Sequence, residues 1–206
     1  MSVNVTRMEL LRLKRLLGIA ERAKSLLEEK RTILAMEILS TISRARGLID
    51  EMEIKLRKAY QSFSLAEATM GRSGLLGLAI KTPTRFRIEI DRRRIMGVET
   101  PIFNLVEEAG GERRASYSLI GTTTYLDEAV SMMEDTLKVM VKVAEIEATV
   151  KALAAELEKI KRRVNALEHI VIPRLRRDIA FIEFRLEEME REHLFRIERI
   201  VGEQQS

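Results

Sequence analysis

The stretch LKRLLGIAERAKSLLEEKRTIL, which runs from Leu13 to Leu34, decides the fold. Apolar or small residues recur in it at mostly three- and four-residue intervals, at Leu13, Leu16, Ala20, Ala23, Leu27 and Leu34. This spacing forms the seam of a coiled coil, because residues three and four apart lie on one face of an α-helix. The stretch therefore predicts a helix that pairs with a second helix.

The helical pattern extends from Thr6 to about Met70 without a proline. Thr6 and Glu9 have the spacing of a capping box, in which each side chain accepts the other residue's backbone N–H. Beyond Leu34 the expected seam consists of Ile38, Ile42, Ala45, Ile49, Met52, Leu56, Ala59 and Phe63. We therefore assign residues 1–70 to the N-terminal long helix of the coiled coil.

A second long helix is predicted for residues 123–206, beginning near Thr124. The first part of its expected seam is Val130, Met133, Leu137, Met140, Ala144 and Ala148. The seam continues through Leu153, Leu157, Ile160, Val164, Leu167, Leu175, Ile179, Ile182, Leu186 and Met189. Pro173 interrupts this pattern, and proline lacks an N–H and clashes with the preceding turn. We therefore expect a kink or break near Pro173.

Residues 71–122 differ in composition, since they hold seven of the ten glycines and two of the three prolines. Residues 85–91 alternate apolar and polar side chains, which is the period of a half-buried strand. We predict a hairpin over about residues 84–103 that turns over the run Arg92–Arg94. Residues 71–77, which are rich in glycine, are interpreted as a flexible exit from the first helix.

Two long helices joined by a short insert are expected to fold back on each other. Partners would then have residue numbers that add to roughly 192, which places Gly18 close to Pro173. The predicted fold class is mainly α: a long antiparallel two-helix coiled coil with a small insert of short helices and a β-hairpin at the turn end.

Composition excludes several classes of function. The chain of 206 residues has no cysteine, which removes thiol nucleophiles, thiolate metal sites and disulfides. Its longest apolar stretch is about six residues, too short for direct membrane insertion. His169 and His193 lack metal-ligand spacing, and the glycines of residues 71–77 lack the following lysine of a phosphate loop. We therefore predict no catalytic, cofactor-binding or metal-binding residue.

The net charge of +4 is unevenly distributed. Residues 7–24 and 159–177 are locally basic, and an antiparallel pair would bring them largely alongside each other as a collar. An acidic protein surface is the expected partner, because the aromatic platform of a nucleic-acid binder is missing; a solvated helix face is the alternative. The residues of this basic collar are Arg7, Arg12, Lys14, Arg15, Arg162, Arg163, Arg174, Arg176 and Arg177.

Several motifs together resemble the D subunit of archaeal and vacuolar-type rotary ATPases. The N-terminal motif is NVTRMELLRLK at residues 4–14. The C-terminal motifs are RRVNALE at residues 162–168, IVIPR at 170–174 and RLEEMERE at 185–192. Residues 94–98 and 121–129 match the middle of that family, so the resemblance covers essentially the whole chain.

The resemblance implies a non-catalytic rotor subunit of a central stalk. Such a subunit transmits torque between a membrane ion-translocating ring and a catalytic hexamer, coupling ATP synthesis or hydrolysis to proton or sodium transport. The implied partners are the catalytic and regulatory nucleotide-binding subunits, a small companion stalk subunit and the funnel-shaped subunit that caps the membrane ring. The implied location is peripheral, on the cytoplasmic side of the membrane. The alternative function is a stand-alone coiled-coil scaffold or tether, and an isolated enzyme is a third.

Overall fold

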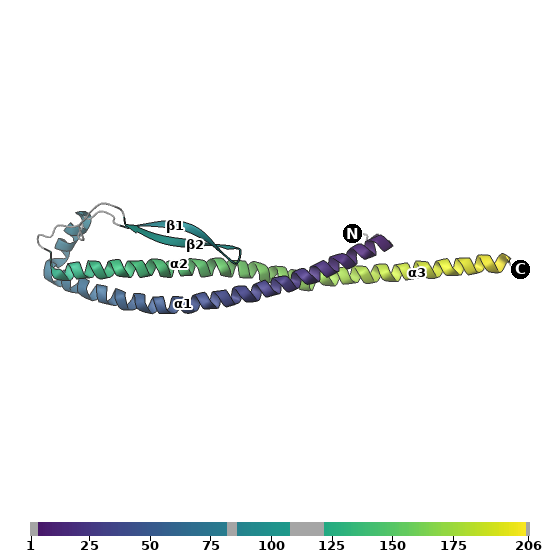
Figure 1. Cartoon of the computed structure of the whole chain (residues 1–206), viewed down its shortest axis with the longest axis horizontal. Helices are drawn as coiled ribbons and strands as arrows, with labels where there is room; N and C mark the ends of the chain where they lie inside the picture. The colour runs from purple at the N-terminus through teal and green to yellow at the C-terminus, as the bar shows by residue number, and fades with distance from the viewer. Residues whose placement is uncertain (1–3, 82–85, 108–121, 205–206) are drawn as a thin grey trace. The chain divides into compact units, whose positions relative to one another are not determined.

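The computed structural model describes residues 4–81, 86–107 and 122–204. Its elements are α1 (Arg7–Lys81), β1 (Phe86–Ile95), β2 (Val98–Glu107), α2 (Thr124–Ala166), the π-helical turn η1 (Leu167–Val171) and α3 (Ile172–Gln204) (Figure 1). The strands form one antiparallel sheet. The expected mainly α fold, a coiled coil with a β-hairpin insert, is confirmed.

The chain forms two compact units. Unit 1 comprises Met1–Ile33 and Leu157–Ser206, and unit 2 comprises Leu34–Glu156. Each unit contains part of α1 together with a later helix, and the hairpin belongs to unit 2.

The start and the end of α1 are set by local chemistry. The Glu9 N–H donates to Thr6 Oγ1 at 3.2 Å, as predicted, but the Glu9 carboxylate accepts from Arg12 at 3.4 Å. Near its other end α1 is kinked at Gly71, whose φ of 74° favours glycine. The helix then resumes and reaches Lys81. The flexible exit predicted for residues 71–77 is therefore wrong, because only one residue leaves the helical conformation.

The core of unit 1 is aliphatic. Leu13 of α1 packs with Ile179 and Ile182 of α3, and Ile182 is fully buried. The residues packed around this cluster are Val5, Leu10, Leu17, Leu175 and Leu186. Leu16 had been expected in the seam but is exposed, since the neighbouring Leu17 takes that position.

The seam of unit 2 is built from smaller and more polar side chains. Its buried residues are Leu34, Thr41, Ala59, Ser62, Ala66, Leu126, Ala129, Thr136, Val139, Val141, Thr149 and Leu153. The Ser62 hydroxyl contacts the sulfur of Met132 at 4.0 Å, which places α1 against α2. Met133 and Met140, expected in the seam, are more than a third exposed. The prediction followed the bulkier apolar residues, whereas threonine and alanine occupy the contact positions.

The hairpin has a two-residue turn at Met96 and Gly97, between the paired residues Ile95 and Val98. Both turn residues have positive φ, 50° and 83°, as a type I′ turn requires. The predicted turn over Arg92–Arg94 is therefore wrong: these arginines lie within β1 and pair with residues 99–101 of β2. Gly97 sets the turn position because glycine adopts positive φ without strain.

Pro101 fits within β2 because of this register. In a hairpin with a two-residue turn, alternate residues direct their N–H groups outward, and on β2 these are residues 99, 101, 103 and 105. A proline at such a position removes no hydrogen bond from the ladder.

Candidate interaction surface

The nine predicted collar residues lie in unit 1, on α1, on the last turns of α2 and on α3. They were expected to form one basic band facing a partner. The contacts of each arginine and lysine decide how much of that charge is available, because a cation already paired within the chain offers less to an external acid.

Three ion pairs join α1 to α3 at regular intervals. Arg7 contacts Glu190 at 2.5 Å, Lys14 contacts Glu183 at 2.7 Å, and Arg176 contacts Glu21 at 2.8 Å. The pairs are spaced seven residues apart on both helices, and the partners' numbers add to 197 each time. These pairs form an interhelical ladder along the flank of the aliphatic seam. The pairing is antiparallel, as predicted. The sum of 197 belongs to long side chains beside the seam, whereas the core residues Leu13 and Ile179 add to the expected 192.

A fourth interhelical pair links α1 to the π-helical turn. Lys24 Nζ lies 2.9 Å from Glu168 Oε1 and 3.8 Å from Glu28. The hydrogen bond from Lys24 lowers the pKa of the Glu168 carboxyl, and the same bond raises the pKa of Lys24. Both Lys24 and Glu168 therefore stay charged over a wide range around neutral pH.

The η1 turn ends at Val171, two residues before Pro173, where a kink or break is expected from the sequence.

Three further collar residues pair within their own helix. Arg12 contacts Glu9 at 3.4 Å, Arg162 contacts Glu158 at 3.7 Å, and Arg174 contacts Asp178 at 3.9 Å. Six of the nine collar residues thus have an acidic partner. The remaining three are exposed and contact no carboxylate in the described part of the chain; they are Arg15, Arg163 and Arg177. We call these three the unpaired arginines.

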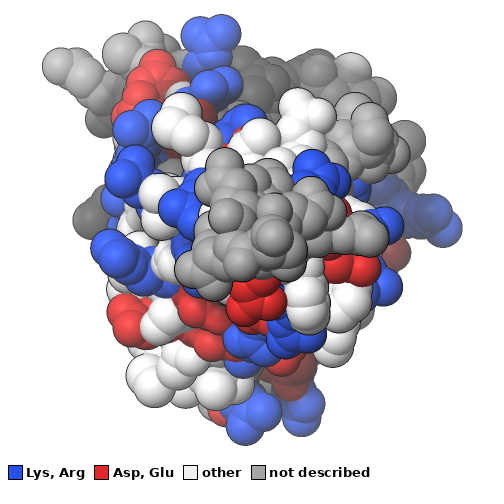
Figure 2. Space-filling view, turned by 90° about the vertical axis from the view of Figure 1, so that its right-hand side faces the viewer, with Lys and Arg blue, Asp and Glu red and all other residues white. Residues whose placement is uncertain are grey.

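The collar residues do not gather into one ring. Arg7 lies beside Glu190, whereas Arg162 precedes Glu190 by 28 positions along the opposite helical run, roughly 40 Å at 1.5 Å per residue. The view in Figure 2 also shows acidic side chains interspersed with basic ones. The sequence pattern identified the basic stretches, but it did not predict the interhelical pairing of Glu21, Glu183 and Glu190, which neutralises part of their charge.

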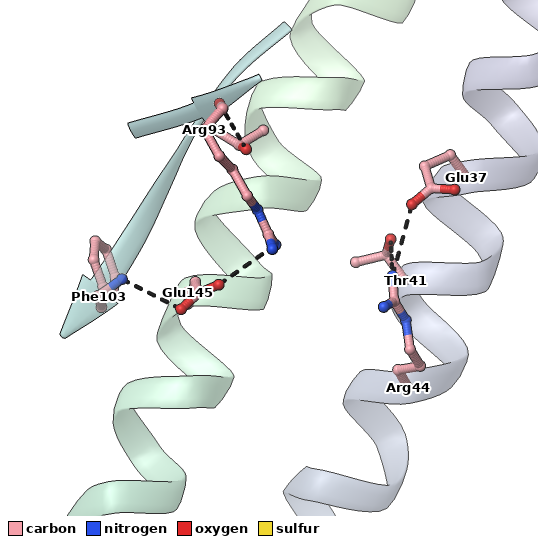
Figure 3. A network of polar contacts seen from close by, with 7 residues as sticks. Glu37, Thr41, Arg44, Arg93, Phe103 and Glu145 are labelled. Atoms are coloured by element: carbon pink, nitrogen blue, oxygen red, sulfur yellow. Dashed lines mark hydrogen bonds and ion pairs between the residues drawn. The ribbon is translucent and has the colours of Figure 1, made fainter. Parts of the chain in front are cut away.

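Unit 2 contains two groups of polar contacts that sequence reasoning missed, one between α2 and the hairpin and one within α1 (Figure 3). Glu145 of α2 contacts both strands of the hairpin: one oxygen lies 3.4 Å from the Arg93 guanidinium, and the other accepts the Phe103 N–H at 3.2 Å. The Thr100 hydroxyl donates to the Arg93 carbonyl at 3.3 Å. On α1, Arg44 contacts Glu37 at 3.7 Å and donates to Thr41 at 3.2 Å. No local motif marks Glu145, because its partners lie more than 40 residues away.

The described residues offer little for chemistry. No group of three or more His, Cys, Asp or Glu side chains in these ranges has the arrangement of a metal site. His169 and His193 are both exposed. Within the same ranges no helix has a long enough apolar run to cross a bilayer.

The fold defines the class first: a helical coiled-coil protein with a β-hairpin insert. The family model described as the D subunit of ATP synthase matches residues 9–202, and this chain belongs to that family. The D subunit of the A-type ATP synthase of Pyrococcus horikoshii is 40% identical over 200 residues, which cover 97% of this chain and 94% of that protein. The protein of the same name from Methanopyrus kandleri is 39% identical over 198 residues, covering 96% and 85%. The resemblance drawn from the sequence motifs is thereby confirmed.

Proposed function

We propose that this chain is the central-stalk rotor subunit of an A-type or V-type rotary ATPase, transmitting torque between a membrane ion-translocating ring and a catalytic hexamer. In this role it is non-catalytic and couples ATP synthesis or hydrolysis to proton or sodium transport. The observation that carries the proposal is the pairing of α1 with α3 inside a single chain of the D-subunit family.

Torque transmission requires two helices that do not slip past each other. The aliphatic cluster of Leu13, Ile179 and Ile182 supplies most of the cohesion, since burial of such side chains stabilises more than exposed ion pairs do. The interhelical ladder also fixes the register of the two helices. If one helix slid along the other by less than one heptad, the charged groups of all three pairs would move apart. A tether that dimerises through its seam would need that seam free, whereas here it is filled within one chain.

The proposed partners follow from this role. They are the catalytic and regulatory nucleotide-binding subunits of the hexamer, the small companion stalk subunit and the funnel-shaped subunit capping the membrane ring. The proposed location is peripheral, on the cytoplasmic side of the membrane. Contact with the hexamer is assigned to the basic collar, chiefly to the unpaired arginines Arg15, Arg163 and Arg177, because their charge is not satisfied within the described chain.

The first test is affinity purification of the tagged full-length chain from its native cells, followed by identification of the co-purifying subunits. Recovery of the nucleotide-binding and stalk subunits supports the rotor assignment. Recovery of the chain alone, or with unrelated proteins only, contradicts it.

The second test addresses the collar in a reconstituted complex. Changing Arg15, Arg163 and Arg177 together to Glu is expected to lower coupled ATP turnover, because three exposed cations become anions. The matched control reverses the exposed Arg46, Arg57 and Arg72, which lie outside the collar. A complex that assembles and turns over normally with the collar variant would contradict the assignment of these arginines while leaving the rotor role intact.

A further inference from the structure

The hairpin has no fully buried apolar side chain, although Ile102, Phe103 and Leu105 of β2 are half-buried. In residues 86–107 the one buried side chain is that of Thr100, which is polar and 1% exposed. Ile88 and Ile90 of β1 are 50% and 66% exposed. Elements held mainly by apolar burial separate only with large-scale unfolding, whereas an element without it separates at lower cost.

Two polar contacts to a single carboxylate add to this limited apolar burial. Glu145 reaches both strands, through the Arg93 side chain of β1 and the Phe103 main chain of β2 (Figure 3). Its side chain is only 20% exposed, so both contacts are partly shielded from water. Hydrogen bonds and ion pairs that involve a charged group in such surroundings are stronger than exposed ones.

The main-chain contact is specific to the edge of the sheet. Phe103 is one of the β2 residues whose N–H points away from β1, so it has no partner within the hairpin. Pro101, two residues earlier on the same edge, has no N–H to satisfy. The Glu145 carboxylate therefore satisfies an edge donor that would otherwise need water.

We propose that the hairpin is a detachable strap and that Glu145 is the latch that holds it against α2. In the docked state both oxygens of Glu145 are occupied and Thr100 is buried. In the released state the hairpin keeps its own ladder and type I′ turn, while the outward N–H of Phe103 and the Arg93 guanidinium become available to another acceptor. This inference concerns unit 2 alone and does not depend on the rotor role.

The test compares Glu145→Gln with Glu147→Gln in the full-length chain. Glu147 is a matched control because it lies two residues along α2 and contacts Lys151 of the same helix at 2.6 Å. Hydrogen–deuterium exchange at the Phe103 amide is expected to accelerate by up to about tenfold in Glu145→Gln, because the glutamine oxygen still accepts the Phe103 N–H but carries no charge. Glu147→Gln is expected to exchange like wild type. Equal rates in all three proteins, or equal acceleration in both variants, would overturn the proposal.

A distance measurement separates the two arms of the latch. Spin labels at the exposed residues Glu89 of β1 and Lys142 of α2 report docking by pulsed electron resonance. Glu145→Gln should broaden and lengthen the distance distribution. The double variant Arg93→Glu with Glu145→Arg reverses the ion pair and should restore the short distance. Hydrogen–deuterium exchange at the Phe103 amide should stay fast in it, because an arginine cannot accept the Phe103 N–H. If the double variant gave the same long and broad label distance as Glu145→Gln, the role of Arg93 in the latch would be refuted.

Discussion

Lys24 of α1 and Glu168 of the π-helical turn form a 2.9 Å ion pair that links the two chain segments of unit 1. The pairing lowers the pKa of Glu168 below 4.5 and raises the pKa of Lys24 above 10.5, chiefly through their shared hydrogen bond. A lowered carboxyl pKa means stability that is present above about pH 4.5 and is lost as pH falls through the folded pKa. A raised amine pKa means stability that is present below about 10.5 and is lost as pH rises through the folded pKa.

The pH dependence of unfolding tests this pair. We expect Glu168→Gln to be less stable than wild type between these limits and to approach it in acid, where Glu168 of the wild type is protonated. Urea unfolding between pH 2.5 and 7 gives the comparison. The control is Glu158→Gln, which removes an exposed pair within one helix at 3.7 Å. If the difference in unfolding free energy between Glu168→Gln and wild type did not change with pH, the prediction would be contradicted.

The interhelical ladder predicts a rescue by charge exchange. Lys14→Glu places a second acid beside Glu183 and should destabilise the chain by about 0.2–1 kcal/mol, the range for exposed pairs. Adding Glu183→Lys should restore most of that loss, since the two helices then attract each other again. Thermal unfolding of the two single variants and the double variant gives the coupling energy. Additive losses would show that the pair does not contribute.

Thr149 predicts a stabilising change. Its side chain is 2% exposed and its hydroxyl has no hydrogen-bond partner, so the hydroxyl is desolvated without compensation. Thr149→Val keeps the shape and should raise the free energy of unfolding by about 1 kcal/mol. The control is Thr136→Val, because the equally buried Thr136 hydroxyl donates to the Met132 carbonyl at 2.7 Å. Thr136→Val should be neutral or destabilising, and the same gain in both variants would argue against the explanation.

The glycines of α1 predict opposite effects at two positions. A Cβ added at Gly18 would meet no atom within 4 Å, so Gly18 makes no close approach to a partner helix and the contact expected with Pro173 does not require a glycine. Gly18→Ala should stabilise by about 0.5–1 kcal/mol through helix propensity. Gly71→Ala should destabilise, because φ is 74° there although space is free. Chemical unfolding of both variants checks the signs, and a loss at Gly18 would indicate a contact absent from the structure.

The sequence predicted the parts of this fold that depend on local periodicity. In unit 1 the expected seam residues Leu13, Ile179 and Ile182 are buried, because large aliphatic side chains mark a helix face clearly. In the first half of α2 the same reasoning selected Met133 and Met140, which are exposed, while Thr136 is buried. A seam made of small and polar residues has little hydrophobic contrast, so periodicity does not identify it.

The candidate surface was only partly predictable for a related reason. The positions of the basic residues can be counted along the chain, and the basic stretches are real. The acidic partners of these residues cannot be found in that way, because Glu190 lies 183 residues from Arg7 and becomes its neighbour only when the helices pair antiparallel. The sequence therefore identified nine candidates, of which the structure leaves three without an acidic partner in the ranges it describes.

The sequence by itself determined a mainly α chain with paired helices, a capped start at Thr6 and one hairpin, because helix seams, caps and strand alternation are set by residues a few positions apart. Tertiary structure alone decided which acids pair with the basic residues of the collar, the kink at a single glycine, and the contact of Glu145 with the hairpin. Those features depend on which groups distant in the sequence come into contact once the helices pack. A charged side chain can pair with a distant one only when the folded backbone brings the two side chains together.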